Sequence, residues 1–144
     1  MGRTEIHLAL FPDSQAPALA RGSLDALEDK LTGETLEQAR LLVSELVTNS
    51  VVHAALGPDD RVGLRVTLPE GVVRVEVTDP GAGFEMPAFE YDAPPTGVSG
   101  WGLHLVDKLS HRWGVYTEGR TCVWFELLRE AGGAGGLRIS RGLG

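Results

Sequence analysis

Hydrophobic and polar residues alternate along residues 62–68 and 73–77, where apolar side chains occupy every second position. A period of two is that of a β-strand with one buried face, and the sequence Pro69-Glu70-Gly71 between the two stretches suits a hairpin turn. Residues 112–128 contain a second pair of short strand-like stretches. Two β-hairpins are therefore predicted, and the apolar residues 4–10 predict a further strand at the edge of a sheet.

Three other segments show the period of amphipathic α-helices. They are residues 14–31, 35–55 and 101–109. In the first, Gly33 follows as a stop signal, and the side chains on or near one face are Leu19, Leu24, Leu27 and Leu31. At the start of the second, Thr35 and Gln38 resemble a capping box, which satisfies unpaired amides at a helix N-terminus. The core side of this second helix is predicted to consist of Leu36, Ala39, Val43, Leu46, Val47 and Ala54.

The order of these elements is strand, helix, helix, hairpin, loop, helix, hairpin. Because the strands come as hairpin pairs, the sequence predicts an α+β fold, a two-layer sandwich of a largely antiparallel mixed sheet with about three helices on one face. Residues 80–99 lose the periodicity, and a loop of this length inside a compact domain is usually functional or mobile. The glycine-rich residues 131–144 predict a flexible tail after a domain of residues 1–130.

The composition is that of an ordinary soluble globular protein, with 144 residues, 42% hydrophobic and 23% charged. No apolar run is long enough for a transmembrane helix and no signal peptide is recognised, so a cytoplasmic protein without membrane contact is expected. The net charge of −7 argues against direct binding of nucleic acid, whose phosphates attract basic surfaces. A single nucleotide remains possible, because backbone amides, a helix N-terminus and Mg²⁺ can hold its phosphates.

Three polar side chains recur at intervals of four residues in the second predicted helix: Glu45, Asn49 and His53. This spacing places them on one stripe of the helix. A solvated stripe is the simplest interpretation, but Leu41, Leu42 and Val52 share this side of the helix. A carboxylate beside an amide in partly apolar surroundings suits a site that needs oxygen ligands for a metal and a base.

Two glycine-rich segments carry further signals of a ligand site. A predicted strand ends at Asp79, and Gly81 and Gly83 then allow close approach of the backbone to a ligand, although Asp-Pro-Gly is also common in plain turns. The third predicted helix begins after a second group of glycines, and its N-terminal amides would suit an anion. These glycines are Gly97, Gly100 and Gly102. A loop without a ligand is the alternative, and neither segment is a Rossmann, Walker A or nucleophile-elbow motif.

The three segments ELVTNSVVH, DPGAGF and SGWGLHLVDKL occur in this order along the chain. They resemble the asparagine box and the two glycine boxes of the histidine-kinase-like ATPase superfamily. The span from about Thr4 to Leu128 resembles, more closely, the stand-alone anti-sigma regulatory factor serine/threonine kinases of the RsbW and SpoIIAB type. Three ordered boxes are a specific signal, and they identify the nucleotide-binding fold better than the physiological task.

The resemblance implies the Bergerat ATP-binding fold, with ATP and Mg²⁺ as cofactors. Asn49 would hold Mg²⁺, Glu45 would be the general base, and Asp79 would accept a hydrogen bond from the adenine amino group. His53 is expected to pack or cap at the helix end. Residues 85–99 would form the ATP lid. The remaining implied contacts are those of Gly81 and Gly83 with adenine, of Gly100, Gly102 and Leu103 with the phosphates, and of Thr121 with adenine through water.

The function implied by the resemblance is that of an anti-sigma factor serine-protein kinase. Such a protein would bind a sigma factor and phosphorylate a serine of an antagonist with a STAS domain, the anti-anti-sigma protein. Because relatives dimerise, a homodimer is expected. The alternative is a non-catalytic, ATP-dependent protein-binding module of the same fold. Retention of Glu45 favours the enzyme, since a pure binder does not need a base.

Overall fold

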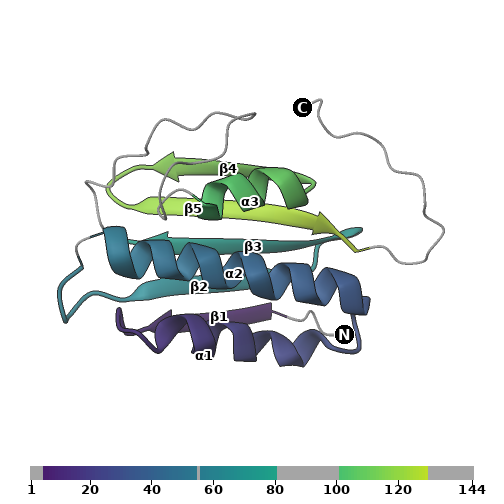
Figure 1. The fold of residues 1–144 in the computed structure, drawn as a ribbon, viewed down its shortest axis with the longest axis horizontal. Helices are drawn as coiled ribbons and strands as arrows, with labels where there is room; N and C mark the ends of the chain where they lie inside the picture. Colours follow the sequence, from purple (N-terminus) through teal and green to yellow (C-terminus); the bar gives the residue numbers. More distant parts are fainter. Residues whose placement is uncertain (1–4, 55, 81–100, 130–144) are drawn as a thin grey trace.

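The computed structural model describes residues 5–54, 56–80 and 101–129 (Figure 1). The predicted lid, the tail from residue 131, and Gly81, Gly83 and Gly100 lie outside the described residues. The elements are β1 (Glu5–Leu10), α1 (Ala16–Ser23), the 3₁₀-helix η1 (Leu24–Leu27), α2 (Gly33–His53), β2 (Val62–Thr67), β3 (Val72–Asp79), α3 (Trp101–Leu109), β4 (Arg112–Thr117) and β5 (Thr121–Leu128).

The strands form one five-stranded sheet in the order β1-β2-β3-β5-β4. All four pairings between these strands are antiparallel, and the two predicted hairpins are β2–β3 and β4–β5. Figure 1 shows α1, α2 and α3 on the same side of the sheet. The predicted α+β fold with helices on one face is therefore confirmed, and so is the edge position of the first strand.

The core lies between the sheet and the helices. Alternate residues of β2 and β3 and the apolar stripe of α2 are all buried, as their periodicities predict. Phe125 of β5 is a fully buried member of this cluster and pairs with Val75 of β3. Each such side chain removed from water stabilises the fold by about 1.5–3 kcal/mol, so this core accounts for the two-layer arrangement. The buried residues of α2 include Leu36, Ala39, Val43, Leu46 and Val47.

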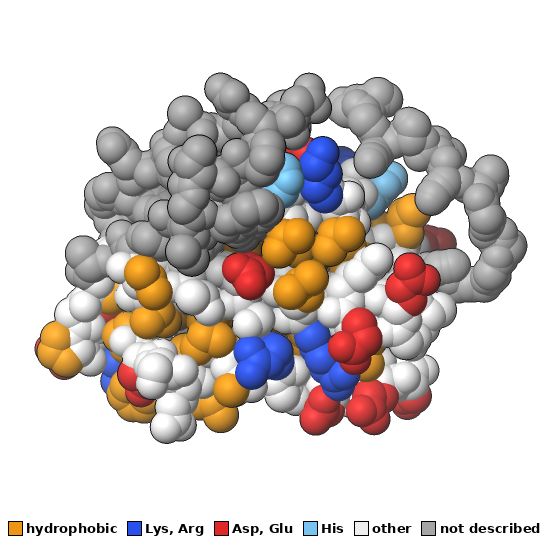
Figure 2. Space-filling view, viewed as in Figure 1, with side chains coloured by type: hydrophobic (Ala, Val, Ile, Leu, Met, Phe, Trp, Pro, Cys, Tyr) orange, Lys and Arg blue, Asp and Glu red, His pale blue; other side chains and the backbone are white. Residues whose placement is uncertain are grey.

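The first helix differs from its prediction as one continuous element from residue 14 to 31. It ends at Ser23, and a 3₁₀ turn over Leu24–Leu27 follows. The buried positions of α1 are Ala16 and Ala20, so Leu19, about 100° away from Ala20, points outward and is 58% exposed. Hydrophobic side chains do reach the surface on the helix side of the molecule (Figure 2). The prediction that Leu19 shares the leucine face is wrong because the tighter 3₁₀ turn changes the phase of the pattern.

The start of α2 also lies three residues before the predicted capping box. Thr32 is the N-cap, in an extended conformation, and its Oγ1 accepts a hydrogen bond of 3.2 Å from the backbone amide of Thr35. Gly33 is the first residue of the helix and not a stop signal. The prediction of a cap at Thr35 is therefore wrong, and the helix gains one turn because a cap is set by the local backbone conformation as well as by residue type.

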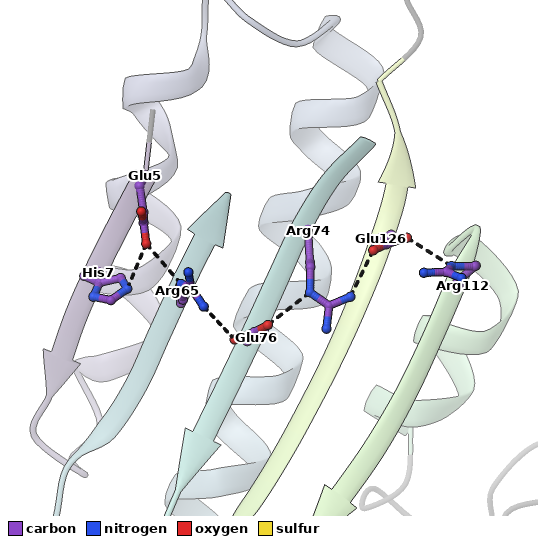
Figure 3. Close-up of polar contacts among 7 residues, drawn as sticks. All are labelled: Glu5, His7, Arg65, Arg74, Glu76, Arg112 and Glu126. Carbon is purple, nitrogen blue, oxygen red and sulfur yellow. Dashed lines mark hydrogen bonds and ion pairs between the residues drawn. The ribbon is translucent and has the colours of Figure 1, made fainter. Parts of the chain in front are cut away.

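The face of the sheet opposite the helices carries a row of charged side chains (Figure 3). Arg74 lies at its centre and donates hydrogen bonds to Glu76 at 3.0 Å and to Glu126 at 2.9 Å. The Arg74 guanidinium also lies 4.2 Å from the ring centroid of Trp124, and Trp124 itself lies close over Gly114, where a Cβ would come within 2.8 Å of the indole nitrogen. The other members are Glu5, His7, Arg65 and Arg112. Alternating charges on neighbouring strands stabilise the sheet by about 0.2–1 kcal/mol per pair.

Glu126 should make the stability of this sheet depend on pH. Burial of its carboxyl opposes ionisation, but hydrogen bonds from Arg112 and Arg74 outweigh burial and hold the pKa of Glu126 below its usual range. A lowered pKa means that the stabilisation is present above the ordinary glutamate pKa and is lost as the pH falls through the folded-state value. We expect Glu126→Gln to lower the free energy of unfolding at pH 7 by about 1–3 kcal/mol.

Urea unfolding of both proteins near pH 7 and near pH 3 measures this effect, because the difference between them cancels the carboxyls that they share. The difference should shrink in acid, where Glu126 of the parent protein takes up a proton. Glu118→Gln is the matched control, because Glu118 is exposed in the turn between β4 and β5 and should show little difference at either pH. A difference between parent and Glu126→Gln that stays constant across this range would contradict the prediction.

Candidate functional site

The predicted polar stripe of α2 lies at the boundary between the core and solvent. Glu45 and Asn49 are both half-buried. Leu41 and Val52 are 42% and 62% exposed, whereas Leu42 is fully buried. The expectation that all three apolar residues crowd the stripe is therefore wrong for Leu42, since α2 packs against α3 and the core extends to this side of the helix. His53 is the last residue of α2, and its side chain lies outside the described residues.

Asp79 and Thr121 meet at the ends of two neighbouring strands. Asp79 is the last residue of β3, Thr121 is the first of β5, and the two are paired in the antiparallel register. Both are buried, at 4% and 3% exposure. Antiparallel partners in one ladder place their side chains on the same face of the sheet, here the face that the helices cover. The structure therefore brings together two of the residues that the sequence singled out for adenine.

Ser50 is a member of this group that the sequence reasoning missed. Its hydroxyl donates a hydrogen bond of 2.7 Å to Oδ2 of Asp79, and its side chain is buried. A signal was available: Ser50 lies four residues after Leu46 and seven after Val43, on the core face of α2. A polar side chain on a buried face needs a hydrogen-bond partner, and across this interface the partner is a carboxylate.

Polar and apolar groups from three elements, α2, β3 and β5, line one hollow between α2 and the sheet. Its lining residues are Leu46, Asn49, Ser50, Val77, Asp79, Thr121 and Val123. The enclosed volume is about 20 Å³, room for roughly one water molecule. The described residues therefore supply one wall of the candidate site. Its chemistry is apolar on the flanks, with a buried carboxylate and hydroxyls at the base, which suits a flat ring that carries a hydrogen-bond donor.

The donor set of α2 fits a metal that is shared with a ligand. Asn49 offers a side-chain oxygen, a ligand that Mg²⁺ prefers, and Glu45, the predicted base, lies one helical turn away. Among the described residues, no group of three or more histidine, cysteine, aspartate or glutamate side chains is placed to hold a metal. Mg²⁺ commonly takes one or two protein oxygens and completes its shell with water and substrate phosphates. These residues fit that mode of binding and not an all-protein cage.

The N-terminus of α3 is the remaining described part of the candidate site. Gly102 and Leu103 lie in its first turn, as predicted, and the side chain of Leu103 lies outside the described residues. The unpaired amides of a helix N-terminus favour anions. Further along the helix, Val106 is buried and Asp107 accepts a hydrogen bond of 3.1 Å from the indole nitrogen of Trp113 in β4. These contacts hold α3 against α2 and the sheet.

Two other expectations concern the burial of Cys122 and the presence of a helix that could cross a membrane. Cys122 is buried at 4% exposure, as expected, but its position in β5 places it on the face of Trp124 and Glu126, opposite the face that packs against the helices. Within the described ranges, none of the helices combines the length and the apolar character that crossing a bilayer requires.

Comparison with known proteins agrees with this geometry. Residues 12–127 match the family described as the histidine kinase-like ATPase domain. The serine-protein kinase RsbW of Listeria monocytogenes serotype 4a (strain HCC23) is 28% identical over 139 residues, which cover 88% of each chain. The anti-sigma F factor of Geobacillus stearothermophilus is 33% identical over 84 residues, covering 56% of this chain and 58% of that protein, so the match spans little more than half of either.

Two solved structures share the fold. The RsbU and RsbW domains of Rv1364c from Mycobacterium tuberculosis align with a TM-score of 0.67 and 18% identity, over 87% of this chain and 32% of that one. The histidine kinase domain of a blue-light activated histidine kinase from Erythrobacter litoralis aligns with a TM-score of 0.52 and 25% identity, over 78% of this chain and 59% of that one. The present chain thus spans about a third of the first solved chain and three-fifths of the second.

Proposed function

Because the chain belongs to the histidine kinase-like ATPase domain family, which implies the use of ATP, we propose that it is an anti-sigma factor serine-protein kinase. In this proposal it binds a sigma factor, phosphorylates a serine of a STAS-type anti-anti-sigma protein, and acts as a homodimer. The names of its relatives, serine-protein kinase RsbW and anti-sigma F factor, support this assignment.

The observation that carries the nucleotide part of the proposal is the buried carboxylate of Asp79, hydrogen-bonded by Ser50 and paired in register with Thr121. An ionised carboxylate only accepts hydrogen bonds, so it selects a ring that presents a donor. The 6-amino group of adenine is such a donor, whereas guanine carries an oxo group, which only accepts, at the same position of the ring. In this proposal Asp79 accepts from the adenine amino group, and Thr121 contacts the ring through water.

The phosphates and the metal are assigned to the helices. We place Mg²⁺ on the side-chain oxygen of Asn49, where it would neutralise phosphate charge. The backbone amides of Gly100, Gly102 and Leu103 are proposed to hold phosphate oxygens near the N-terminus of α3. Gly81 and Gly83 are proposed to border the adenine ring. Phosphoryl transfer depends mainly on positioning and charge neutralisation, so this small set of groups suffices.

The exposure of Glu45 supports a protein as the phosphate acceptor. Its carboxylate is half-buried on the outer side of α2, on the same stripe as the exposed side chains of Leu41 and Val52. A base at this position is accessible to a hydroxyl from a second protein, and the exposed apolar side chains offer that protein a contact surface. We propose that Glu45 takes the proton from the acceptor serine as the phosphoryl group is transferred.

Transfer of labelled phosphate tests the proposed activity. We expect the protein, incubated with Mg²⁺ and ATP labelled in the γ-phosphate, to label the STAS-domain protein encoded next to it, on one serine. Replacing that serine with alanine, or removing Mg²⁺ with a chelator, should abolish the label. Binding of ATP without transfer would favour the non-catalytic binding module instead, and failure to bind ATP would contradict the nucleotide site itself.

A further inference from the structure

The hydrogen bond between Ser50 and Asp79 joins the helix layer to the sheet at the candidate site, between residues 29 positions apart in the sequence. Ser50 Oγ lies 2.7 Å from Asp79 Oδ2, and the two residues are 8% and 4% exposed. Hydrogen bonds from a hydroxyl to a carboxylate are typically this short and are stronger than those between neutral groups. This bond connects α2 to the last residue of β3.

Two other serines of the chain donate their hydroxyl hydrogen bonds to a different kind of partner from that of Ser50. Ser110 donates to the carbonyl oxygen of Val106 at 2.6 Å, and Ser23 donates to that of Ala20 at 2.7 Å. Such bonds to the preceding turn are the ordinary way for a serine in or after a helix to satisfy its hydroxyl. Ser50 had the same option within α2, yet its hydroxyl reaches across to the sheet. The bond therefore satisfies the hydroxyl of Ser50 through the carboxylate of Asp79 and not through the preceding turn of the helix.

The bond also has a mechanical consequence for Asp79. The terminal torsion of an aspartate is broad, so a carboxylate at the end of a strand can rotate unless a partner holds it. Ser50 is fixed within a 21-residue helix whose neighbouring residues are in the core, so its hydroxyl is a rigid donor. With Oδ2 held from this side, the plane of the carboxylate is set relative to the hollow lined by Val77, Thr121 and Val123.

We propose that Ser50 is a positioning residue for base selectivity. By orienting the carboxylate of Asp79, it strengthens the hydrogen bond that Asp79 accepts from the 6-amino group of a purine, and so favours 6-aminopurine over 6-oxopurine and unsubstituted purine nucleotides. This inference rests on the proposed binding of ATP at this site. It goes further because it assigns part of the selectivity to a residue of α2 that does not itself touch the ring.

The test compares ATP with purine riboside triphosphate, which is ATP without the exocyclic amino group. Calorimetry gives the dissociation constant of each nucleotide, with Mg²⁺, for the parent protein, for Ser50→Ala and for the control Thr48→Ala. Thr48 is an exposed hydroxyl residue of the same helix. In Ser50→Ala the preference for ATP over the analogue should fall about tenfold, which corresponds to one hydrogen bond to a charged group. Binding of the analogue should change less than about twofold, and Thr48→Ala should match the parent.

The outcomes separate the two proposals. A Ser50→Ala protein that keeps the parent preference for ATP overturns the role of Ser50 while leaving the nucleotide site intact. Equal weakening of both nucleotides also overturns it, because that result indicates a structural role only. If the parent binds neither nucleotide, the proposed function fails and this inference fails with it. Should Ser50→Ala not fold by circular dichroism, Ser50→Cys preserves the volume with a weaker donor and is expected to lose selectivity in the same direction.

Discussion

Replacement of Asn49 by alanine should abolish binding of Mg²⁺-ATP. Asn49 is half-buried on α2 and lines the hollow that contains Asp79 and Thr121, and in our proposal its amide oxygen shares a metal with the phosphates. Loss even of groups that only support a metal ligand costs about 10–100-fold in metal affinity, so loss of the ligand itself should exceed about 100-fold. Titration calorimetry with ATP in the presence of Mg²⁺ measures the change.

A suitable control for Asn49→Ala removes another amide from the same helix. Gln38 lies three turns earlier, is half-buried, and does not line the hollow, so Gln38→Ala should bind Mg²⁺-ATP like the parent. Both variants introduce alanine, which has a high helix propensity, so unfolding of α2 should not account for a difference between them. Parent-like affinity in Asn49→Ala would remove Asn49 from the site.

Replacement of Glu45 by alanine should leave ATP binding within about twofold of the parent and reduce transfer by about 10²–10⁴-fold, the usual contribution of a positioned general base. The reason is its location. Glu45 is half-buried and does not line the hollow with Asp79, so we expect nucleotide binding not to depend on it. Binding is followed by calorimetry, and transfer by the rate of serine labelling at saturating ATP.

The matched control for Glu45 is Glu34, an exposed carboxylate in the first turn of the same helix. Glu34→Ala changes the net charge by the same amount and should preserve both binding and transfer. Undiminished transfer by Glu45→Ala would exclude Glu45 as the base. A loss of ATP binding together with transfer would instead make Glu45 part of the nucleotide site, for example as a second oxygen ligand of the metal.

These predictions give α2 a central place in the molecule. Consecutive residues of a helix point about 100° apart, so Asn49 and Ser50 serve different parts of the site from adjacent positions. Ser50 points to the sheet and bonds to Asp79, while Asn49 lies at the rim of the hollow. Glu45, one turn earlier, faces outward. Sites built on a buried helix are held more precisely than sites on loops, which suits a reaction that depends on positioning.

The strands and the third helix were predictable to within a residue or two. In β2 and β3, strict alternation leaves only one way to bury the apolar face of each strand, so the strand positions follow from the pattern. The helix α3 begins and ends as expected, at Trp101 and Leu109. The first helix was not predictable in the same way, because the change to a 3₁₀ turn at Leu24 is invisible to a fixed period of 3.6 residues. The cap at Thr32 was missed because Thr35 with Gln38 matches the capping-box pattern by residue type, whereas Thr32 caps through its extended backbone conformation.

The sequence by itself determined the order of the elements, the α+β class and the family, through its alternating strands and three ordered motifs. It also singled out Glu45, Asn49, Asp79 and Thr121, whose roles remain to be tested. Only the tertiary structure decided that Leu42 belongs to the core, and that Ser50 holds the carboxylate of Asp79. The physical reason is that a periodic pattern reports which face of an element is buried. Which polar groups meet on that face depends on strand register and helix packing, and these join residues far apart in the chain.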